Sequence, residues 1–547
     1  MTDFSLDIVD PVDLARTWEL DDMHMPYALT PLASDYITKA LGASFNHHYE
    51  LFGGSQTLAA RVWHGYAYFG FSWNVPKDQE DAVKVRWTEA ARARIAVTAT
   101  YWRDEAIPEL QGLYGSIASV AVDELVPAAL VDAWRDAWAA TLRAWQIHFI
   151  SILGPYQVLE DLADQYAAAM GPGHDVEALT LVEGATHELE DVEAEIEALA
   201  AMLAASPPLA AAVAPLAARS HDDRSRDDDL PVDRDAVAAA PGGRAFLDAL
   251  DAFLARHGHL GQTHDDLHDA SWAEAPAALL ANIGRRTPIP GASPAERLAQ
   301  QRRTAEERAS AARAVLADRS EELGRFETTL AYAREIGHLT ESHNYWIDRM
   351  AQARLRVLVK RIARRLVREG ALERADDIFF LGRDEVAEAI TDGRPRHDLV
   401  RERREAFERQ RAMHPPRYVG PIPEDTGPPD RFDNARIEST KPDELRGTGA
   451  SAGIVRGPAR LVASQDAFGA VQPGDIVICP ASNPSWVPVF TIAGGLVTNT
   501  GGVLSHAAVV AREFGLPAVV GVTGATDKIR DGRLVEIDGI AGIVRLL

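Results

Sequence analysis

Residues Gly494–Val520 read GGLVTNTGGVLSHAAVVAREFGLPAVV. The apolar run after the first Gly-Gly pair predicts a short buried strand over 494–499. Ser505 is a good helix N-cap, and residues 506–514 have a helical composition with small alanines for tight packing. Gly515 ends that helix, and the chain then resumes an extended path. The segment therefore predicts a strand, a glycine turn, a helix and a second strand, in that order.

His506 falls in the first turn of this predicted helix. Backbone N–H groups without partners and the helix dipole favour an anion there and disfavour a cationic imidazole. The neutral ring is the nucleophilic form, so the position suits a histidine that carries a phosphoryl group. Thr500, Gly501, Gly502 and Ser505 offer hydroxyl and N–H donors that would cradle the phosphate. On spacing alone, a helix-start histidine without chemistry is an equally good interpretation.

Residues 500–521 resemble the phosphohistidine motif of the swivelling domain in phosphoenolpyruvate-utilising enzymes, a family that includes rifampicin phosphotransferase and the phenylphosphate synthase subunits. Flanking segments resemble the strands that open and close that domain: 449–457, 473–478, 531–539 and 542–546. The resemblance implies that residues 445–547 form a small α/β swivelling phosphohistidine domain. It also implies that His506 is the catalytic residue.

The composition favours a large, soluble, cytoplasmic protein. The chain has 547 residues, of which 46% are apolar, and this length suits about three domains. No apolar run reaches the roughly 18 residues that a membrane helix needs, and the N-terminus lacks the basic and apolar regions of a signal peptide. We therefore expect no membrane partner.

The formal net charge is −25, and all of it resides in residues 1–440. So acidic a surface argues against nucleic acid as the main partner, although solubility alone would also explain the charge. The single cysteine, Cys479, excludes an internal disulfide or a cysteine metal cluster. It follows an apolar run and is expected to be a buried structural thiol. The sequence predicts no metal site on this chain.

Residues 1–413 are predicted to form a large, mainly α-helical region of one or two subdomains. Long amphipathic helices are expected over three segments, Leu181–Leu203, Ser293–Glu327 and Glu341–Glu369. Residues 221–229 have no apolar side chain to bury, which predicts a mobile acidic loop at about 221–235. Residues 414–444 are proline-rich, as in a semi-rigid hinge linker that lets a carrier domain visit two sites. A fixed surface strap is the alternative.

The helical region also resembles the acceptor-binding part of rifampicin phosphotransferase and phenylphosphate synthase. The matching blocks are short and scattered, at residues 18–32, 257–272, 341–349 and 370–381. Related enzymes often carry an Arg-Glu pair where this chain has Thr340-Glu341, so a charge near the transferred phosphate is missing or comes from elsewhere. The predicted fold class is therefore multidomain, with a mainly α-helical acceptor-binding region followed by the α/β swivelling domain.

Candidate acceptor-site residues lie in these blocks. Glu341, His343 and Arg349 fall on one predicted helix, where Glu341 and Arg349 share a face while His343 projects elsewhere. Exposed helix polarity would also explain all three. Candidate bases for activating a hydroxyl are His24, His47, His48 and His259, as any histidine of suitable pKa would be.

Aromatic side chains crowd the segment Trp63–Trp73. Such side chains would line a pocket for an aromatic or hydrophobic alcohol, although core packing uses them more often. The expected acceptor is therefore a small organic molecule with a hydroxyl group.

The phosphoryl donor is inferred from what the chain lacks. No block resembles the nucleotide-grasp domain of the related enzymes, and none of the six lysines follows a glycine, which excludes a Walker-type P-loop. The resemblance implies a dikinase-type phosphotransferase in which a separate ATP-grasp subunit binds ATP and Mg²⁺ and charges His506, releasing AMP and phosphate overall. Charging by phosphoenolpyruvate or by a phosphorylated carrier protein is one alternative. A non-catalytic binding or regulatory protein that retains the carrier fold is another.

Overall fold

The structure is a computed structural model of the chain, which divides into two compact units. Unit 1 comprises residues 1–157, 218–279 and 339–424, and unit 2 comprises residues 158–217, 280–338 and 425–547. The described residues are 11–547, apart from 23, 55, 74, 172–173, 186, 218–233, 262–265, 287–293, 422–440, 442, 463–464, 483–485, 491 and 504. Most of the predicted acidic loop at 221–235 and of the predicted linker at 414–444 lies outside the described residues.

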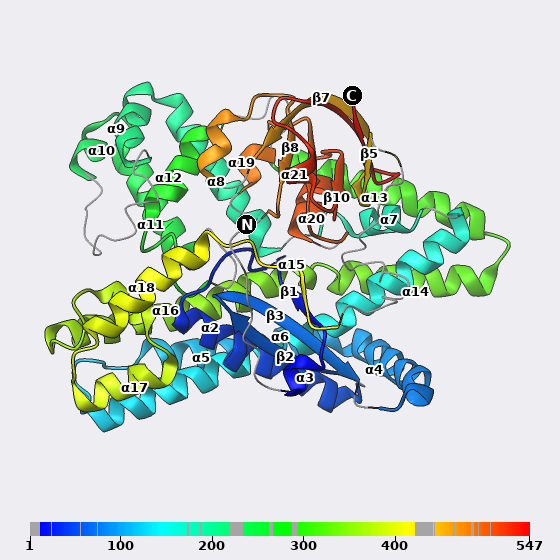
Figure 1. The fold of residues 1–547 in the computed structure, drawn as a ribbon. Coiled ribbons are helices and arrows are strands. Elements are labelled where there is room, and N and C mark those ends of the chain that lie inside the picture. The colour runs from blue at the N-terminus through cyan, green and yellow to red at the C-terminus, as the bar shows by residue number, and fades with distance from the viewer. Residues whose placement is uncertain are drawn as a thin grey trace. The chain divides into compact units, whose positions relative to one another are not determined.

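Unit 1 contains a four-stranded antiparallel sheet with the strand order β2-β3-β1-β4 (Figure 1). A hairpin at one edge of the sheet joins β2 (Gln56–Trp63) to β3 (Tyr66–Trp73) through His64 and Gly65. Both turn residues have positive φ, 49° and 81°. This conformation suits the two-residue turns whose twist matches that of paired strands.

The same sheet fixes the first residues of the predicted linker. β4 (Tyr418–Val419) pairs with β1 (Trp18–Leu20). The Tyr68 hydroxyl donates a hydrogen bond to the carbonyl of Pro416 at 2.7 Å. The chain is therefore held against the sheet as far as Val419.

An apolar core lies in unit 1, and many helices of the unit contribute buried side chains to it. The principal helices are α2 (Pro31–Tyr36), α3 (Gly42–Phe52), α4 (Glu80–Tyr101), α5 (Ile107–Ala118), α6 (Pro127–Met170), α11 (Gly243–His257), α15 (Leu339–His343), α16 (Met350–Arg368), α17 (Arg383–Asp392) and α18 (His397–Arg411). Three π-helical turns interrupt them: η1 (Ile37–Leu41), η3 (Trp102–Ala106) and η6 (Asn344–Arg349). Helix α16 shows why the helices form. Its apolar residues recur at helical spacing and are buried: Leu355, Leu358, Val359, Ile362 and Leu366. The aromatic segment predicted around residues 63–73 contributes Tyr66 and Tyr68 to this core.

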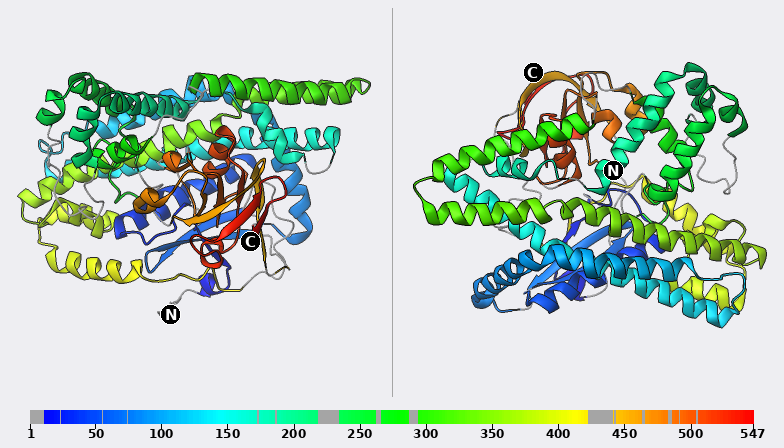
Figure 2. Two further views of the ribbon diagram at one scale, coloured as in Figure 1. Left: turned by 90° about the horizontal axis from the view of Figure 1, so that it is seen from above. Right: turned by 180° about the vertical axis from the view of Figure 1, so that it is seen from behind.

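The helices of unit 2 include a hairpin that the sequence does not indicate. We expected one helix over Ser293–Glu327, but this prediction is wrong because α13 (Pro294–Leu316) ends before α14 (Ser320–Ile336) begins (Figure 2). The reversal lets each helix bury its own apolar face, including Ala309 and Ala312 on α13 and Phe326 and Leu330 on α14. Unit 2 also contains α8 (Glu188–Ala205) and α9 (Pro207–Ala217).

In the described part of the chain, each helix taken singly is too short or too polar to cross a membrane. The pair α8 and α9 meets the length and composition criteria only when joined across a bend of 119°.

The C-terminal part of unit 2 is an eight-stranded sheet with the order β5-β12-β11-β7-β8-β9-β10-β6, orange to red in Figure 1. The pairs β7–β8, β8–β9 and β9–β10 are parallel, and the other pairs are antiparallel. The strands are β5 (Glu444–Arg446), β6 (Thr448–Ser451), β7 (Ile454–Leu461), β8 (Ile476–Cys479), β9 (Gly495–Thr498), β10 (Ala518–Val520), β11 (Leu534–Asp538) and β12 (Ile543–Leu546). The predicted strand–turn–helix–strand order over 494–520 is confirmed, with α20 (His506–Glu513) between β9 and β10.

Buried side chains on both faces of the parallel strands explain their continuous apolar runs. Cys479 ends β8 and is fully buried, as predicted, and burial raises the pKa of its thiol. The predicted fold class, a large mainly helical region followed by a small α/β domain, is confirmed.

Gly539 gives a test of this packing. A Cβ at this position would lie 1.8 Å from the carbonyl oxygen of Ser451, whereas a Cβ at Gly469 would meet no atom within 4 Å. We expect Gly539→Ala to lower the free energy of unfolding by about 1–3 kcal/mol, as overpacking does, and Gly469→Ala to leave it nearly unchanged. Calorimetric melting of both variants checks this. Equal melting temperatures for the two would contradict the strand arrangement.

Candidate functional site

The loop before His506 leaves the carboxyl end of the central parallel strand β9. The N–H of Thr500 donates to the carbonyl of Pro480 at 3.1 Å. The Thr498 hydroxyl donates to the carbonyl of Thr500 at 2.6 Å. Both threonines are buried. The loop is therefore anchored to the segment that follows the neighbouring strand β8.

Gly501 and Ser505 shape the end of this loop. Gly501 has φ of 106°, and a Cβ there would lie 2.8 Å from the Ser505 hydroxyl oxygen, so only glycine fits. Ser505 is the N-cap of α20 with φ of −65° and ψ of 153°. Its Oγ caps no helix N–H and has no hydrogen-bond partner within the described part of the chain. This hydroxyl and the first N–H groups of α20 can therefore receive an anion.

His506 is the first residue of α20. The structure describes its backbone and not its side chain. At this position the partial positive charge of the helix N-terminus lies next to the imidazole-bearing residue. The backbone thus places a histidine, a buried glycine turn and an unused serine hydroxyl at one helix start.

Arg512 connects the loop before His506 to strand β6. Its Nη1 donates to the carbonyl of Val503 at 2.8 Å and to that of Ala450 at 3.1 Å. Its Nε lies 3.6 Å from a carboxylate oxygen of Glu183, and the Arg512 side chain is only 8% exposed. These contacts agree with a packing role for Arg512 rather than a role as a phosphate clamp.

A second polar site lies inside unit 1, which we call the Asp348 cluster: His148, Tyr156, Glu341, His343 and Asp348. The Nδ1 of His148 lies 2.7 Å from Asp348 Oδ1, and the Nε2 of His343 lies 3.9 Å from Asp348 Oδ2. The His148 and His343 rings meet edge to face at 4.6 Å. Asp348 belongs to the π-helical turn η6, a backbone irregularity that often occurs at functional sites.

Burial and neighbouring charges set the protonation of this cluster. Burial is the largest cause that lowers the pKa of His343 below its ordinary value, and His148 adds to it. Burial alone would raise the pKa of Asp348, but the charge and hydrogen bond of His148 outweigh it, so the net pKa is lowered. Burial raises the pKa of Tyr156, and the carboxylates of Glu341 and Asp348 raise it further. The cluster thus holds a carboxylate in a dry interior by means of imidazole partners.

His259 lies beside a small internal cavity near η6. The cavity is lined in part by His259, Arg349, Gln352 and Arg356. The His259 ring meets that of Tyr345 edge to face at 4.5 Å. Burial, followed by the charges of Arg354 and His257, lowers the pKa of His259 from 6.5 to about 3. The imidazole is therefore neutral at physiological pH.

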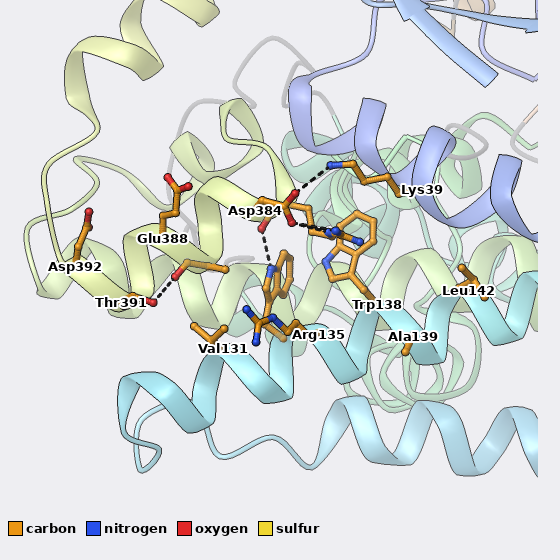
Figure 3. A pocket seen from close by; sticks show the side chains of 13 residues that line it. Lys39, Val131, Arg135, Trp138, Ala139, Leu142, Asp384, Glu388, Thr391 and Asp392 are labelled. Carbon is orange, nitrogen blue, oxygen red and sulfur yellow. Dashed lines mark hydrogen bonds and ion pairs between the residues drawn. The ribbon is translucent and has the colours of Figure 1, made fainter. Parts of the chain in front are cut away.

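A pocket of about 700 Å³ opens between α6 and α17 in unit 1 (Figure 3). Trp134 and Trp138 form its aromatic part, and the Arg383 guanidinium lies 5.7 Å from the Trp138 ring centre. Lys39 reaches Asp384 at 3.6 Å across it. The Trp138 side chain is buried, and its Nε1 has no hydrogen-bond partner among the residues that the structure describes. The pocket combines aromatic surface with charges of both signs.

Two family models match parts of the chain. Residues 471–542 match the mobile domain of PEP-utilising enzymes, and residues 149–341 match the fourth domain of rifampicin phosphotransferase. The resemblance to phosphoenolpyruvate-utilising enzymes is confirmed.

Similar proteins from three bacteria agree with these matches. A chondramide synthase of Chondromyces crocatus is 28% identical over 98% of this chain and 14% of its own length. The uncharacterised phosphotransferase YvkC of Bacillus subtilis (strain 168) is 30% identical over 56% of this chain and 37% of its own length. A rifampicin phosphotransferase of Streptomyces sviceus is 33% identical over 57% of this chain and 36% of its own length. The chain thus spans little more than a third of the two phosphotransferases.

The structure brings four of the five predicted acceptor-site residues close to η6. Glu341, His343 and Arg349 are all buried, so exposed helix polarity does not account for them. His259 contacts Tyr345 of the same turn. His24 lies elsewhere. Its side chain is 48% exposed, and its Nδ1 lies 3.0 Å from Asp21 Oδ1.

Sequence reasoning missed His148 and Asp348. His148 lies 200 positions from Asp348 along the chain, and no local pattern marks it. Asp348 stands five positions after His343, a spacing at which an ideal α-helix would separate the two side chains. Their approach to 3.9 Å spans the π-helical turn, which begins directly after His343.

The anchoring by Arg512 of the loop before His506 is testable. Arg512→Met keeps most of the volume but removes the hydrogen bonds to the carbonyl of Val503 in the loop and to that of Ala450 in β6. We expect the free energy of local opening to fall by about 1–2 kcal/mol. Hydrogen exchange of a peptide covering residues 498–503 should then be faster. Arg530→Met, an exposed control, should leave exchange unchanged, and equal exchange in both variants would refute the anchoring role.

The buried imidazole of His259 predicts a pH dependence of stability. Since its pKa falls from 6.5 to about 3 on folding, the unfolded chain binds more protons in that window. The free energy of unfolding should therefore rise with pH between about 3 and 6.5. The contribution of His259 to stability is lost as the pH falls through this range. His259→Gln cannot titrate and should flatten this slope. Melting temperatures of both proteins between pH 4 and pH 7 measure it, and parallel slopes would contradict the assignment.

Proposed function

We propose that this chain is the carrier and acceptor-binding part of a phosphotransferase, and that His506 carries the phosphoryl group. The observation that carries the proposal is the position of His506 as the first residue of α20, behind the positive-φ Gly501. The names of the similar phosphotransferases support the same role.

The chemistry at His506 follows from its surroundings. A neutral imidazole nitrogen attacks the phosphorus of the donor, the leaving group departs with the bond electrons, and a phosphohistidine forms. Ser505 Oγ and the backbone N–H groups at Gly501 and Gly502 would cradle the phosphate. The Thr500 hydroxyl donates to the carbonyl of Pro480 at 3.2 Å and would have to give up that hydrogen bond to join them. The helix dipole favours the anionic phosphohistidine over a cationic imidazolium.

We propose ATP as the donor, bound with Mg²⁺ by an ATP-grasp partner subunit. The ATP is converted overall to AMP and phosphate, as in dikinase-type enzymes. Mg²⁺ and ATP would then belong to the partner and not to residues of this chain.

The acceptor is proposed to be a small hydroxyl compound that binds to unit 1. Glu341, His343, Arg349 and His259 are the proposed acceptor-site residues around η6. The pocket of Trp134 and Trp138, on the same unit, favours an acceptor with an aromatic or hydrophobic portion, because aromatic walls bind such groups.

Phosphorylation of His506 tests the proposal. The full chain is incubated with Mg²⁺ and β-labelled ATP, with and without cell extract, and its intact mass is measured. We expect one phosphate adduct that needs the extract, is acid-labile and alkali-stable, and disappears in His506→Ala. His174→Ala, which removes a half-exposed imidazole of unit 2, should keep the adduct.

Other outcomes would separate the alternatives. An adduct with phosphoenolpyruvate and none with ATP would identify phosphoenolpyruvate, and not ATP, as the donor. No adduct from either donor would favour a binding protein that retains the carrier fold.

A further inference from the structure

Two imidazoles and one carboxylate of the Asp348 cluster meet inside unit 1. They come from α6 (His148), α15 (His343) and η6 (Asp348). One donor atom of each residue lies within 4.8 Å of the others, and all three residues are buried. The sequence predicted no metal site, because these residues come together only in the folded unit.

The hydrogen bond on the far side of His343 fixes which nitrogen faces the cluster. His343 Nδ1 lies 2.7 Å from the backbone carbonyl oxygen of Leu339. A carbonyl only accepts, so Nδ1 carries the hydrogen and Nε2 presents a lone pair. That lone pair faces Asp348 Oδ2 at 3.9 Å, too far for a hydrogen bond. Two acceptor atoms thus face each other in a buried site, an arrangement that a cation between them would satisfy.

The third donor completes a ligand set. His148 Nδ1 lies 2.7 Å from Asp348 Oδ1, so this pair shares a proton in the metal-free chain. A cation replaces that proton, which leaves to solvent, as is general when metals bind histidine sites. The Leu339 carbonyl accepts the hydrogen bond of His343 Nδ1, and such a bond orients a ligating imidazole and raises its basicity.

We propose that His148, His343 and Asp348 bind a zinc-class divalent ion. Two imidazole nitrogens and one carboxylate oxygen suit Zn²⁺, Co²⁺ or Fe²⁺, whereas Mg²⁺ and Ca²⁺ prefer oxygen ligands. Three protein ligands leave a position for water or for a substrate oxygen. The proposal is independent of phosphate transfer by His506, which belongs to unit 2.

The ion would link segments that are distant in sequence. His148 and Asp348 are 200 positions apart. A ligand that binds only the folded chain stabilises it by mass action. Zn²⁺ should therefore raise the melting temperature of the chain in a saturable manner.

Cobalt titration tests the site with the full chain after treatment with a chelator and removal of the chelator. We expect one Co²⁺ per chain, with visible absorption bands from nitrogen and oxygen ligands that vanish when Zn²⁺ displaces it. His343→Ala and Asp348→Asn should each lower the Co²⁺ affinity at least about tenfold. Asp348→Asn retains an oxygen that can accept the hydrogen bond of His148. His257→Ala, a matched buried histidine of unit 1, should bind Co²⁺ as the wild type does.

Either of two results would overturn the proposal. One is the absence of saturable Co²⁺ absorption in the wild type, and the other is unchanged affinity in both ligand variants. Either would leave His148 and Asp348 as a hydrogen-bonded pair only. If the variants do not fold, X-ray absorption of the Zn²⁺-loaded wild type gives the answer, because a shell without two imidazoles excludes the site.

Discussion

The parallel pairing of β9 with β8 and β10 determines where the loop before His506 begins. Thr498 pairs with Cys479 at one edge of β9, and Leu496 pairs with Ala518 at the other. A central parallel strand has backbone partners on both sides, so its carboxyl end cannot shift without breaking two ladders. Loops at such strand ends are where α/β proteins place ligands. The buried thiol of Cys479 and the anchored Thr500 both follow from this register.

Local signals were sufficient to predict the elements of residues 494–520. A glycine pair, a serine cap and a helix-stopping glycine act within a few residues, so the strand, turn and helix over 494–520 could be read directly. The break of residues 317–319 between α13 and α14 could not, because no glycine or proline marks it. That reversal results from the burial of two apolar helix faces, which only the folded chain reveals.

The candidate acceptor site shows a different limit. Glu341, His343 and Arg349 could be selected by sequence, but their predicted faces assumed an uninterrupted α-helix. The π-helical turn changes the residue spacing per turn, so side chains after His343 no longer follow α-helical faces. His148 lies on α6, far away in sequence, and nothing near it marks its role. In the same way, the aromatic segment at 63–73 supplied core residues, while the tryptophans of the pocket came from α6.

The pairing of β4 with β1 also limits how much of the proposed linker could act as a tether. Chain held in a sheet cannot serve as a tether, so the proposed tether comprises at most the stretch between Val419 and Glu444. At about 3.3–3.6 Å per residue its contour length is on the order of 85 Å. A phosphohistidine carried on such a tether would meet an acceptor of the same chain at an effective concentration in the millimolar range, as for other short linkers. Transfer within one chain would then exceed transfer between chains at ordinary protein concentrations, and the rate per chain would not change on dilution.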